Sequence, residues 1–333
     1  MPDEFVKYSS TTVSRTNVPN HFIPPFNHFR PHRLSFFIED LWFRKQCYNK
    51  KFNIIHSAYY NLSEACYQQI SKGVPHIITV HDLIHELHDD IDKRIVDFRR
   101  NIIENSAAII AVSENTKKDL INFHKSVNPE RIHVIHHGIN LPHIEDRMKI
   151  KKGDENNFLL HVGHREGYKN FKILLPIIKE LSRSENIVLK VVGPERTEEE
   201  EKEIKKYGIS DNIEFLPKVS NEELKFLYLN SLALIYPSLY EGFGIPLIEA
   251  MAHGSIPIAF RTSSIPEVLG DAGIVLEKNE FMKLVFIIKD LINRADYRLK
   301  IKTASIKRAE FFSIKKNIKK TLEVYNRVLN IEV

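Results

Sequence analysis

The stretch SLYEGFGIPLIEAMAHG, residues 238–254, predicts a helix that follows a glycine-containing loop. Pro246 suits the first turn of a helix, and Gly254 suits the position just after its end. Gly242 and Gly244 allow backbone conformations that are closed to other residues, and they let a ligand approach the main chain closely. The loop and the helix start together form a candidate ligand site.

Two carboxylates belong to this stretch. Residues 245–252 are apolar except for Glu249, so we expect the helix to be buried and this carboxylate to need donors that offset its desolvation. Glu241 precedes the helix, so both side chains can face one ligand from different heights. The free N–H groups at the helix start suit an anion, and the carboxylates suit sugar or ribose hydroxyls. A role for Glu249 at the helix dipole and a solvated Glu241 fit the residues equally well.

Short, apolar, β-branched runs followed by helical patterns recur outward from this stretch, which predicts an α/β fold with parallel strands covered on both faces. The runs lie at 52–56, 76–80, 107–112, 132–135, 158–162, 187–192, 213–216, 232–236, 256–260 and 274–276. The polar segment 141–157 predicts an interdomain linker. We therefore expect an N-terminal domain over 1–143, a C-terminal domain over 144–311, and a final helix over 312–333 that packs back toward the N-terminal domain.

The composition favours a globular protein without a disulfide framework or a membrane-spanning segment. The chain has 333 residues, of which 43% are hydrophobic and 27% are charged, as in globular proteins. A net charge of +5 fits an anionic small ligand or an anionic membrane surface and does not argue for nucleic acid. The only cysteines are Cys47 and Cys66, which excludes a disulfide framework. No apolar run reaches the roughly 18 residues of a membrane span, and the start lacks a signal-peptide pattern. We expect a cytoplasmic protein, at most attached to a membrane face.

A second stretch, HVGHREGYKNF at 161–171, places two cations in a loop between a strand and a helix. The strand ends at Gly163, and Arg165 and Lys169 follow. Together these cations can neutralise a diphosphate, Arg as a fork and Lys as a point charge. Two surface cations with no ligand would give the same pattern.

Several motifs taken together resemble one family, the retaining glycosyltransferases of family 4. The motifs are GHREGYKN (163–170), PSLYEGFGIPLIEAMAHG (237–254), TSSIPEV (262–268), TVHDLIHELH (79–88), AVSENTKKDL (111–120) and VIHHGIN (134–140). The resemblance covers about residues 52–330. Within the family, the chain resembles the mannosyltransferase-like enzymes of bacterial O-antigen and capsule assembly. It implies the GT-B fold, with two Rossmann-like domains facing a cleft. Glu241 and Glu249 match the family's Glu-x7-Glu pair.

The resemblance also implies roles for single residues. Arg165 and Lys169 would hold the donor diphosphate and stabilise its charge as it leaves. Glu249 would accept hydrogen bonds from the ribose. Glu241 would bind the transferred sugar, and His81 would reach that sugar from across the cleft. Further donor-binding positions are Gly163, Gly242, the main-chain N–H groups of Phe243, Gly244 and Ile245, and Ser113, which also suits a helix N-cap.

The implied activity is the transfer of a hexose, mannose in the first place, from a nucleotide-diphosphate sugar to a saccharide acceptor with retention. The acceptor would be carried on a lipid, to which it is linked through polyprenyl diphosphate. The nucleoside diphosphate that leaves the donor would take the proton of the acceptor hydroxyl. No cofactor, metal or nucleic acid would take part. Two other classes stay open. One is a sugar-nucleotide epimerase or glycan phosphorylase of the same architecture, and the other is a non-catalytic subunit that binds nucleotide sugar.

A polar run after residue 80 imitates a metal site. His85 and His88 are three residues apart, and Asp90 and Asp92 mimic the DxD motif of the other, metal-dependent glycosyltransferase fold. That motif usually ends a strand beside the donor, whereas this pair lies some ten residues past one. A solvated charged face is the preferred interpretation, so we expect no metal.

The N-terminus departs from the family pattern. Residues 29–52 mix aromatic and basic side chains, which predicts either a core helix with a basic face or a helix on an anionic membrane. Only four strand signals precede the linker, where the family usually has six or seven, and its opening Gly-rich loop has no counterpart before Gly73. We therefore expect a truncated or reduced N-terminal domain that supports donor binding better than transfer.

Overall fold

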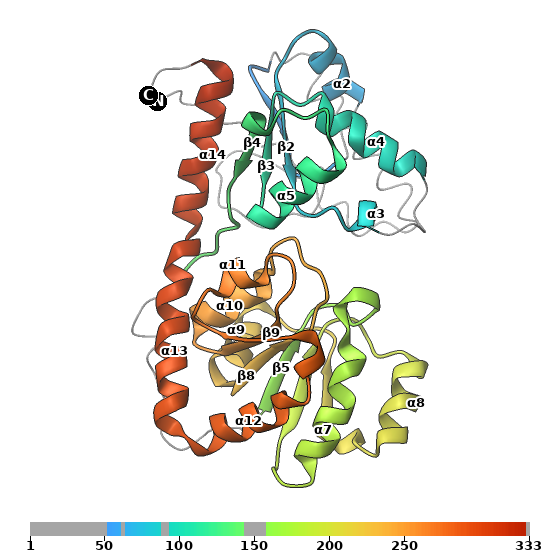
Figure 1. Cartoon of the computed structure of the whole chain (residues 1–333), viewed down its shortest axis with the longest axis vertical. Coiled ribbons are helices and arrows are strands. Elements are labelled where there is room, and N and C mark those ends of the chain that lie inside the picture. Colours follow the sequence, from blue (N-terminus) through green and yellow to red (C-terminus); the bar gives the residue numbers. More distant parts are fainter. Residues whose placement is uncertain (1–51, 61–63, 88–92, 143–157, 331–333) are drawn as a thin grey trace.

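The computed structural model describes residues 52–60, 64–87, 93–142 and 158–330, and these residues form two parallel sheets, each with its own helices (Figure 1). The N-terminal sheet has the strand order β1-β2-β3-β4. Its strands are β1 (Ile55–Ser57), β2 (His76–Val80), β3 (Ala108–Ala111) and β4 (Ile132–Val134). Its helices are α2 (Glu64–Ser71), α3 (Ile84–Leu87), α4 (Lys93–Glu104), α5 (Glu114–Phe123) and the 3₁₀ helix η2 (Pro129–Arg131).

The C-terminal sheet has the order β10-β9-β8-β5-β6-β7. Its strands are β5 (Phe158–Val162), β6 (Val188–Val192), β7 (Ile213–Leu216), β8 (Ala233–Tyr236), β9 (Ile256–Phe260) and β10 (Ile274–Leu276). Its helices are η3 (Gly167–Lys169), η4 (Phe171–Ile173), α7 (Leu174–Ser182), α8 (Glu198–Tyr207), η5 (Ser210–Asn212), α9 (Asn221–Asn230), α10 (Ile245–His253), α11 (Ile265–Leu269) and η6 (Lys278–Glu280).

The order of the C-terminal strands reverses between β5 and β8, which pair directly through Leu159 and Ala233. In open parallel sheets, ligands bind outside the carboxyl ends of the strands at such a switch point. The loop after β5 carries Lys169, and the loop after β8 carries Glu241. The topology therefore places the two stretches that the sequence singles out next to each other.

The alternation of side chains along β5 explains the core of the C-terminal domain. Leu159 packs in a cluster with residues of α7 and of α12 (Lys283–Asn293), whereas Phe158 and Leu160 pack on the other face with residues of α10 and α11. All three are almost fully buried. A strand with both faces covered needs a continuous apolar run, as the FLLHV segment has.

A series of helices, coloured from orange to red in Figure 1, runs from the base of the C-terminal domain along one side of the molecule to the N-terminal domain. We call it the strap: α12 (Lys283–Asn293), α13 (Ala295–Ala309), the 3₁₀ helix η7 (Glu310–Phe312) and α14 (Ile314–Leu329). Val324 of α14 is buried against Ile77 and Ile110 of the N-terminal sheet. Ile139, after β4, exchanges backbone hydrogen bonds with the strap, accepting from Ile314 and donating to Phe312.

Most predicted strands lie where the apolar runs indicated, and 76–80, 158–162, 213–216, 256–260 and 274–276 match in full. The first strand starts at Ile55, three residues later than expected, because residues 52–54 precede the pairing with β2. The helix predicted over 29–52 and most of the predicted linker lie outside the described residues, so the prediction of a reduced N-terminal domain stays a prediction. Within the described ranges, no helix is long and apolar enough to cross a bilayer.

Candidate active site between the two domains

The loop after β8 makes a close contact with the other domain. Gly244 has a φ of 95°, a left-handed conformation that favours glycine, and it caps the start of α10. At Gly242 a Cβ atom would lie 1.7 Å from the carbonyl oxygen of His81, which follows β2. The hydroxyl of Thr116 on α5 also donates to the Gly242 carbonyl at 3.3 Å. The absence of a side chain at Gly242 is what lets the carboxyl ends of the two sheets meet here.

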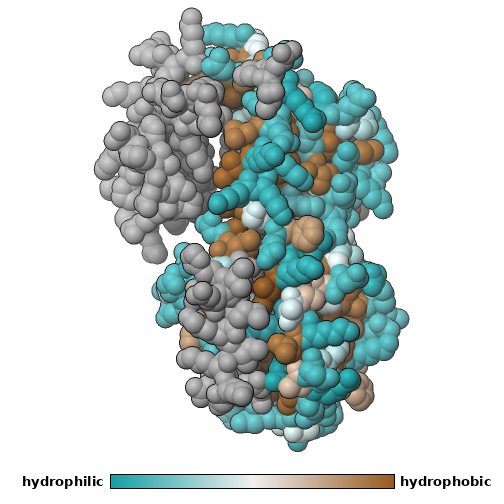
Figure 2. Space-filling model, turned by 90° about the vertical axis from the view of Figure 1, so that its left-hand side faces the viewer, coloured by the Kyte–Doolittle hydropathy of each residue, from teal (hydrophilic) through white to brown (hydrophobic). Residues whose placement is uncertain are grey.

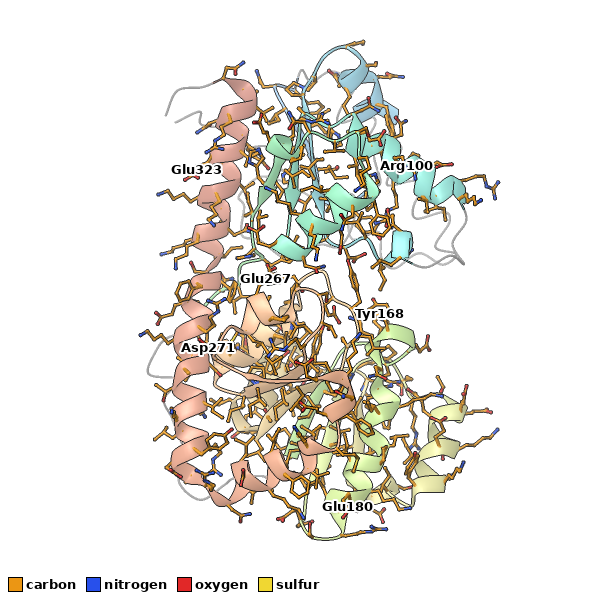
Figure 3. The ribbon with its side chains drawn as sticks, viewed as in Figure 1. Arg100, Tyr168, Glu180, Glu267, Asp271 and Glu323 are labelled. Atoms are coloured by element: carbon orange, nitrogen blue, oxygen red, sulfur yellow. The ribbon has the colours of Figure 1, made fainter. Side chains whose placement is uncertain are left out.

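Lys169 and Glu241 form an ion pair at the switch point. The Lys169 Nζ lies 2.7 Å from Glu241 Oε1, and both side chains are largely buried. The Glu241 backbone N–H donates to Ser263 Oγ, and the Ser264 hydroxyl donates to the Glu241 carbonyl. Nearby Tyr168 points toward the interface between the domains (Figure 3). The pair puts one cation and one acceptor beside the start of α10.

Glu249 has a donor within the protein. The hydroxyl of Tyr228 on α9 donates to Glu249 Oε2 at 3.0 Å. Burial raises the pKa of the Glu249 carboxyl, and the Tyr228 hydrogen bond opposes that rise. Burial, followed by the charge of Glu249, raises the pKa of Tyr228, so its hydroxyl stays protonated as a donor. The carboxylate that the sequence left without a partner therefore has one even before a ligand binds.

Arg165 is placed differently from its prediction. Its side chain is 4% exposed, and it forms a bidentate pair with Glu200 on α8, with Nε–Oε1 at 2.6 Å and Nη2–Oε2 at 2.9 Å. It also donates to the carbonyls of Pro194 and Glu195. Four of its five N–H groups are thus used within the protein. Arg165 ties α8 to the end of β6 instead of facing a diphosphate, while its neighbour His164 is exposed.

His81 lies on the N-terminal side of the interface with both ring nitrogens bonded. Its Nε2 is 2.8 Å from the Ala58 carbonyl, which can only accept, so Nε2 carries the proton. Its Nδ1 then accepts from Nε2 of His137 at 3.2 Å, and the two rings stack. Burial, and then the nearby imidazoles of His81 and His136, lowers the pKa of His137 to about 4. A sugar hydroxyl would have to compete with Ala58 for the His81 N–H.

The other predicted donor-binding positions differ in exposure. Ser113 caps α5 by accepting from the Thr116 N–H, and it is fully buried. Phe243 is buried against the rings of His136, His137 and Phe312, so only its main chain can meet a ligand. Ile245 is 42% exposed at the start of α10. Gly163 follows β5, and its N–H donates to the Val192 carbonyl.

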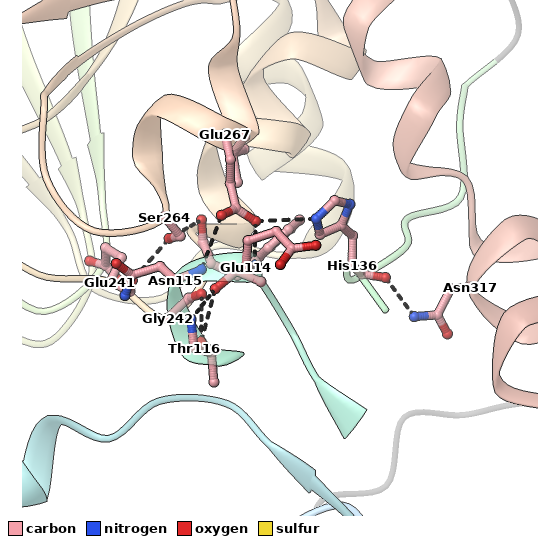
Figure 4. Close-up of polar contacts among 12 residues, drawn as sticks. Glu114, Asn115, Thr116, His136, Glu241, Gly242, Ser264, Glu267 and Asn317 are labelled. Carbon is pink, nitrogen blue, oxygen red and sulfur yellow. Dashed lines mark hydrogen bonds and ion pairs between the residues drawn. The ribbon is translucent and has the colours of Figure 1, made fainter. Parts of the chain in front are cut away.

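A second cross-domain contact was not foreseen (Figure 4). Glu267 of α11 accepts from the backbone N–H groups of Glu114 and Asn115 at the start of α5, at 2.9 and 3.2 Å. Its Oε1 also lies 3.2 Å from His136 Nε2. The Tyr240 hydroxyl donates to Asp119 of α5 at 2.8 Å. These contacts hold α5 against the C-terminal domain in the closed arrangement that the structure shows.

The absence of a metal site stays a prediction. Residues 88–92, which include His88, Asp90 and Asp92, lie outside the described residues. Among the residues that the structure does describe, no group of three or more His, Cys, Asp or Glu side chains is arranged to hold a metal ion.

Two family models match successive parts of the chain. The model described as Glycosyltransferase Family 4 matches residues 5–142, and the model described as Glycosyl transferases group 1 matches residues 143–308. This chain belongs to the family 4 glycosyltransferases.

The curated relatives of the chain are also named as glycosyltransferases. The O-antigen chain mannosyltransferase RfbU of Salmonella typhimurium is 30% identical over 217 residues, which are 64% of this chain and 60% of the relative. The chain spans 60%, 43% and 18% of the lengths of the first three curated relatives it matches. What those whole proteins do is therefore not transferred directly to this family 4 glycosyltransferase.

Solved structures give the fold. Sucrose-phosphate synthase from Thermosynechococcus elongatus superposes with a TM-score of 0.75 at 18% identity, over 95% of this chain and 82% of that one. The Anabaena protein Alr3699/HepE, solved in complex with UDP and glucose, superposes with a TM-score of 0.69 at 18% identity, over 86% and 81% of the two chains. The predicted GT-B fold of two Rossmann-like domains is confirmed for this family 4 glycosyltransferase.

Sequence reasoning missed two groups in this family 4 glycosyltransferase. Tyr228 lies in FLYLN, residues 226–230, where it reads as an ordinary core aromatic, although burial of a tyrosine does call for a hydroxyl partner. Glu267 lies in the quoted TSSIPEV motif, but a carboxylate on a five-residue helix carries no signal that it binds another domain.

Proposed function

We propose that this family 4 glycosyltransferase transfers a hexose, mannose in the first place, from a nucleotide-diphosphate sugar to a saccharide acceptor. The observation that carries the proposal is the Lys169–Glu241 pair beside the start of α10, at the switch point of the sheet. A cation and free helix N–H groups suit a diphosphate, and a carboxylate suits sugar hydroxyls. The mannosyltransferase names among the relatives support mannose as the sugar.

The positions of the side chains support the roles that we propose. Lys169 and the N–H groups at the start of α10 would neutralise the diphosphate, without the contribution first assigned to Arg165. Glu241 would accept from the sugar, and Glu249 would accept from the ribose with the oxygen that Tyr228 leaves free. His81 would donate from the N-terminal domain through Nε2. Each of these groups is fixed by protein contacts before a donor binds, which limits the reorganisation that binding requires.

The proposed reaction retains the anomeric configuration. The bond from the sugar C1 to the diphosphate oxygen breaks, and the acceptor oxygen bonds to C1 on the same face. The acceptor's hydroxyl proton passes to the leaving diphosphate. Charge stabilisation by Lys169 and the α10 N-terminus, together with positioning, would supply the rate enhancement. The protein supplies positive charge at the donor site, so we propose that no metal or other cofactor is required.

The acceptor belongs to the same proposal. Because relatives are named for O-antigen synthesis, we propose a saccharide carried on a lipid, through polyprenyl diphosphate, at the cytoplasmic face of a membrane. Surface polysaccharide of the O-antigen or capsule type would be the product. The modest positive charge of the chain is compatible with an anionic surface.

The test combines binding and turnover in the full chain. GDP-mannose, UDP-glucose and UDP-N-acetylglucosamine are screened for thermal stabilisation, where a ligand at 100 times its Kd stabilises by about 2.7 kcal/mol. The stabilising donor is then incubated with lipid-linked saccharide acceptors, and NMR reads the new anomeric linkage. Transfer with retention supports the proposal. Binding without transfer to any acceptor would favour a non-catalytic subunit, and a changed sugar nucleotide without transfer would favour an epimerase.

A further inference from the structure

A cavity of about 430 Å³ adjoins the site described above and shares His136 and His137 with it, at the point where the strap passes from one domain to the other. One wall is formed by His136 and His137, which follow β4. The opposite wall is formed by the strap around Phe311 and the start of α14. Because both domains contribute to it, the cavity exists only in the assembled protein. We call it the strap pocket.

Four cationic side chains line the strap pocket, Arg308, Lys316, Lys319 and Lys320, against one carboxylate, Glu323. Arg308 donates to the carbonyls of Val268 and Glu267, and Lys316 donates to that of Glu310. Within the described ranges, no carboxylate lies within ion-pair distance of these four cations.

Three exposed lysines elsewhere on the surface are paired with carboxylates. Lys172, Lys205 and Lys225 each lie 2.6 to 3.2 Å from a carboxylate oxygen. These lysines are neutralised by neighbouring carboxylates, whereas the three lysines of the strap pocket have no carboxylate partner among the described residues. Burial lowers the pKa of Arg308, and the charges of Asp271 and Glu267 oppose that shift only in part. An anion in the pocket would offset more of the desolvation of the Arg308 guanidinium.

Aromatic rings lie beside two of the four cations that line the cavity. The Arg308 guanidinium lies 5.1 Å from the ring centroid of Phe311 and 5.3 Å from that of Phe312, and Lys316 Nζ lies 5.3 Å from Phe311. Phe311 itself is 60% exposed, and Ile318, one turn into α14, is 50% exposed. The strap side of the molecule is largely hydrophilic with separate apolar side chains among the polar ones (Figure 2).

We propose that the strap pocket binds a phosphate-bearing anion, and that the exposed Phe311 and Ile318 favour a phospholipid headgroup as its source. A phosphate offers several acceptor oxygens, which suit a cluster of cations with donors to spare. Exposed apolar side chains beside lysines are the arrangement that lies at a lipid interface, with the cations at the headgroups. Free phosphate has the same charge chemistry but gains nothing from the apolar side chains.

The position of the pocket gives the binding a consequence. His136 lines the pocket, bonds to Glu267 through its ring and accepts from the Asn317 amide through its carbonyl. An anion held between the strap and His136 would therefore fix the closed arrangement of the two domains. The proposal does not rest on the sugar donor, and it is tested without one.

The experiment measures vesicle and phosphate binding by the full chain. Lys319→Glu with Lys320→Glu reverses two exposed charges in the pocket, and Lys202→Glu with Lys206→Glu on α8 makes the same change in net charge away from it. Flotation uses vesicles of phosphatidylcholine with or without phosphatidylglycerol, and calorimetry uses inorganic phosphate. Circular dichroism and thermal melting confirm that both double variants are folded.

We expect the pocket variant to bind phosphatidylglycerol vesicles at least about tenfold more weakly than the unmodified chain, with the α8 variant within about twofold. Phe311→Ser weakens vesicle binding but not phosphate binding if a lipid headgroup is the ligand. The site is assigned to free phosphate instead if the unmodified chain binds phosphate saturably but does not bind vesicles, and if the pocket variant loses the phosphate binding. Equal losses in the two double variants, or no binding of either probe, overturn the proposal.

Discussion

The Glu267 carboxylate accepts a hydrogen bond from the backbone N–H of Glu114 at 2.9 Å, and this bond joins α11 of the C-terminal domain to the start of α5 in the N-terminal domain. A carboxylate at a helix N-terminus satisfies unpaired N–H groups and interacts favourably with the helix dipole. Here the carboxylate comes from the other domain. The bond therefore stabilises the closed arrangement as well as the helix.

Glu267→Ala should loosen the interface between the domains. Removing a carboxylate from a helix N-terminus costs about 1 kcal/mol of stability, and the amides of Glu114 and Asn115 should exchange hydrogen faster. Glu222→Ala, which removes an exposed carboxylate from the first turn of α9, serves as the control. Unchanged exchange at both α5 amides would show that the contact does not hold the domains together.

Lys169→Ala should mainly weaken nucleotide binding, whereas Arg165→Ala should mainly lower stability. Lys169→Ala should leave a folded protein that has lost some stability, because the largely buried Glu241 loses its partner. It should weaken nucleotide-diphosphate binding about ten- to a hundredfold, since hydrogen bonds to charged groups contribute roughly 1.5–3 kcal/mol. Arg165→Ala leaves Glu200 without its buried partner and should destabilise the protein by roughly 3 kcal/mol. Calorimetry and denaturant titration separate the two effects. A stable Arg165→Ala protein that no longer binds nucleotide would restore the role first assigned to Arg165.

The two glutamates should affect different parts of the donor. Glu249→Gln should weaken binding of the free nucleoside diphosphate, because its proposed partner is the ribose. Glu241→Gln should leave that affinity nearly unchanged and reduce transfer from the complete sugar donor. Tyr228→Phe, which removes the protein donor to Glu249, provides the matched variant for the Glu249 site. Equal losses of nucleotide affinity in both glutamate variants would contradict this division.

Activity should survive chelation. Lys169 and the start of α10 would provide positive charge at the donor, so EDTA should leave the transfer rate within about twofold, a change worth less than 1 kcal/mol in barrier height. Rate loss that Mn²⁺ or Mg²⁺ reverses would instead direct attention to Asp90 and Asp92, and Asp90→Asn with Asp92→Asn would then test them.

Acid should destabilise the protein through its buried histidines. Burial lowers the pKa of His161 to about 4, whereas its ordinary value is 6.5. Between these values the unfolded chain binds more protons than the folded one, so stability falls as pH falls from 6.5 toward 4. His161→Phe should remove up to about 1 kcal/mol per pH unit of that dependence, measured by urea denaturation. His164→Asn, at an exposed position in the loop that follows β5, should keep this dependence, and identical slopes in both variants would refute the assignment.

Local patterns in the sequence determined the strands and the two loops of the site. A parallel strand covered on both faces needs an unbroken apolar run, and FLLHV at 158–162 is such a run, so it predicts a buried strand. Gly244 and Gly254 bound α10 because both adopt left-handed conformations at its ends. The family was identified from the combination of motifs, since each motif alone can also be explained without a ligand or a catalytic role.

The partners of the charged side chains were decided by the tertiary structure alone. Arg165 and Lys169 share one loop, yet Arg165 turns into the protein toward Glu200 and Lys169 turns to Glu241. Glu249 finds its donor on another helix, and Glu267 finds its partners in another domain. Periodicity fixes which residues face a core within one element, because that depends on backbone geometry over a few residues. Which charge meets which depends on how distant elements pack, and nothing in the local pattern encodes that.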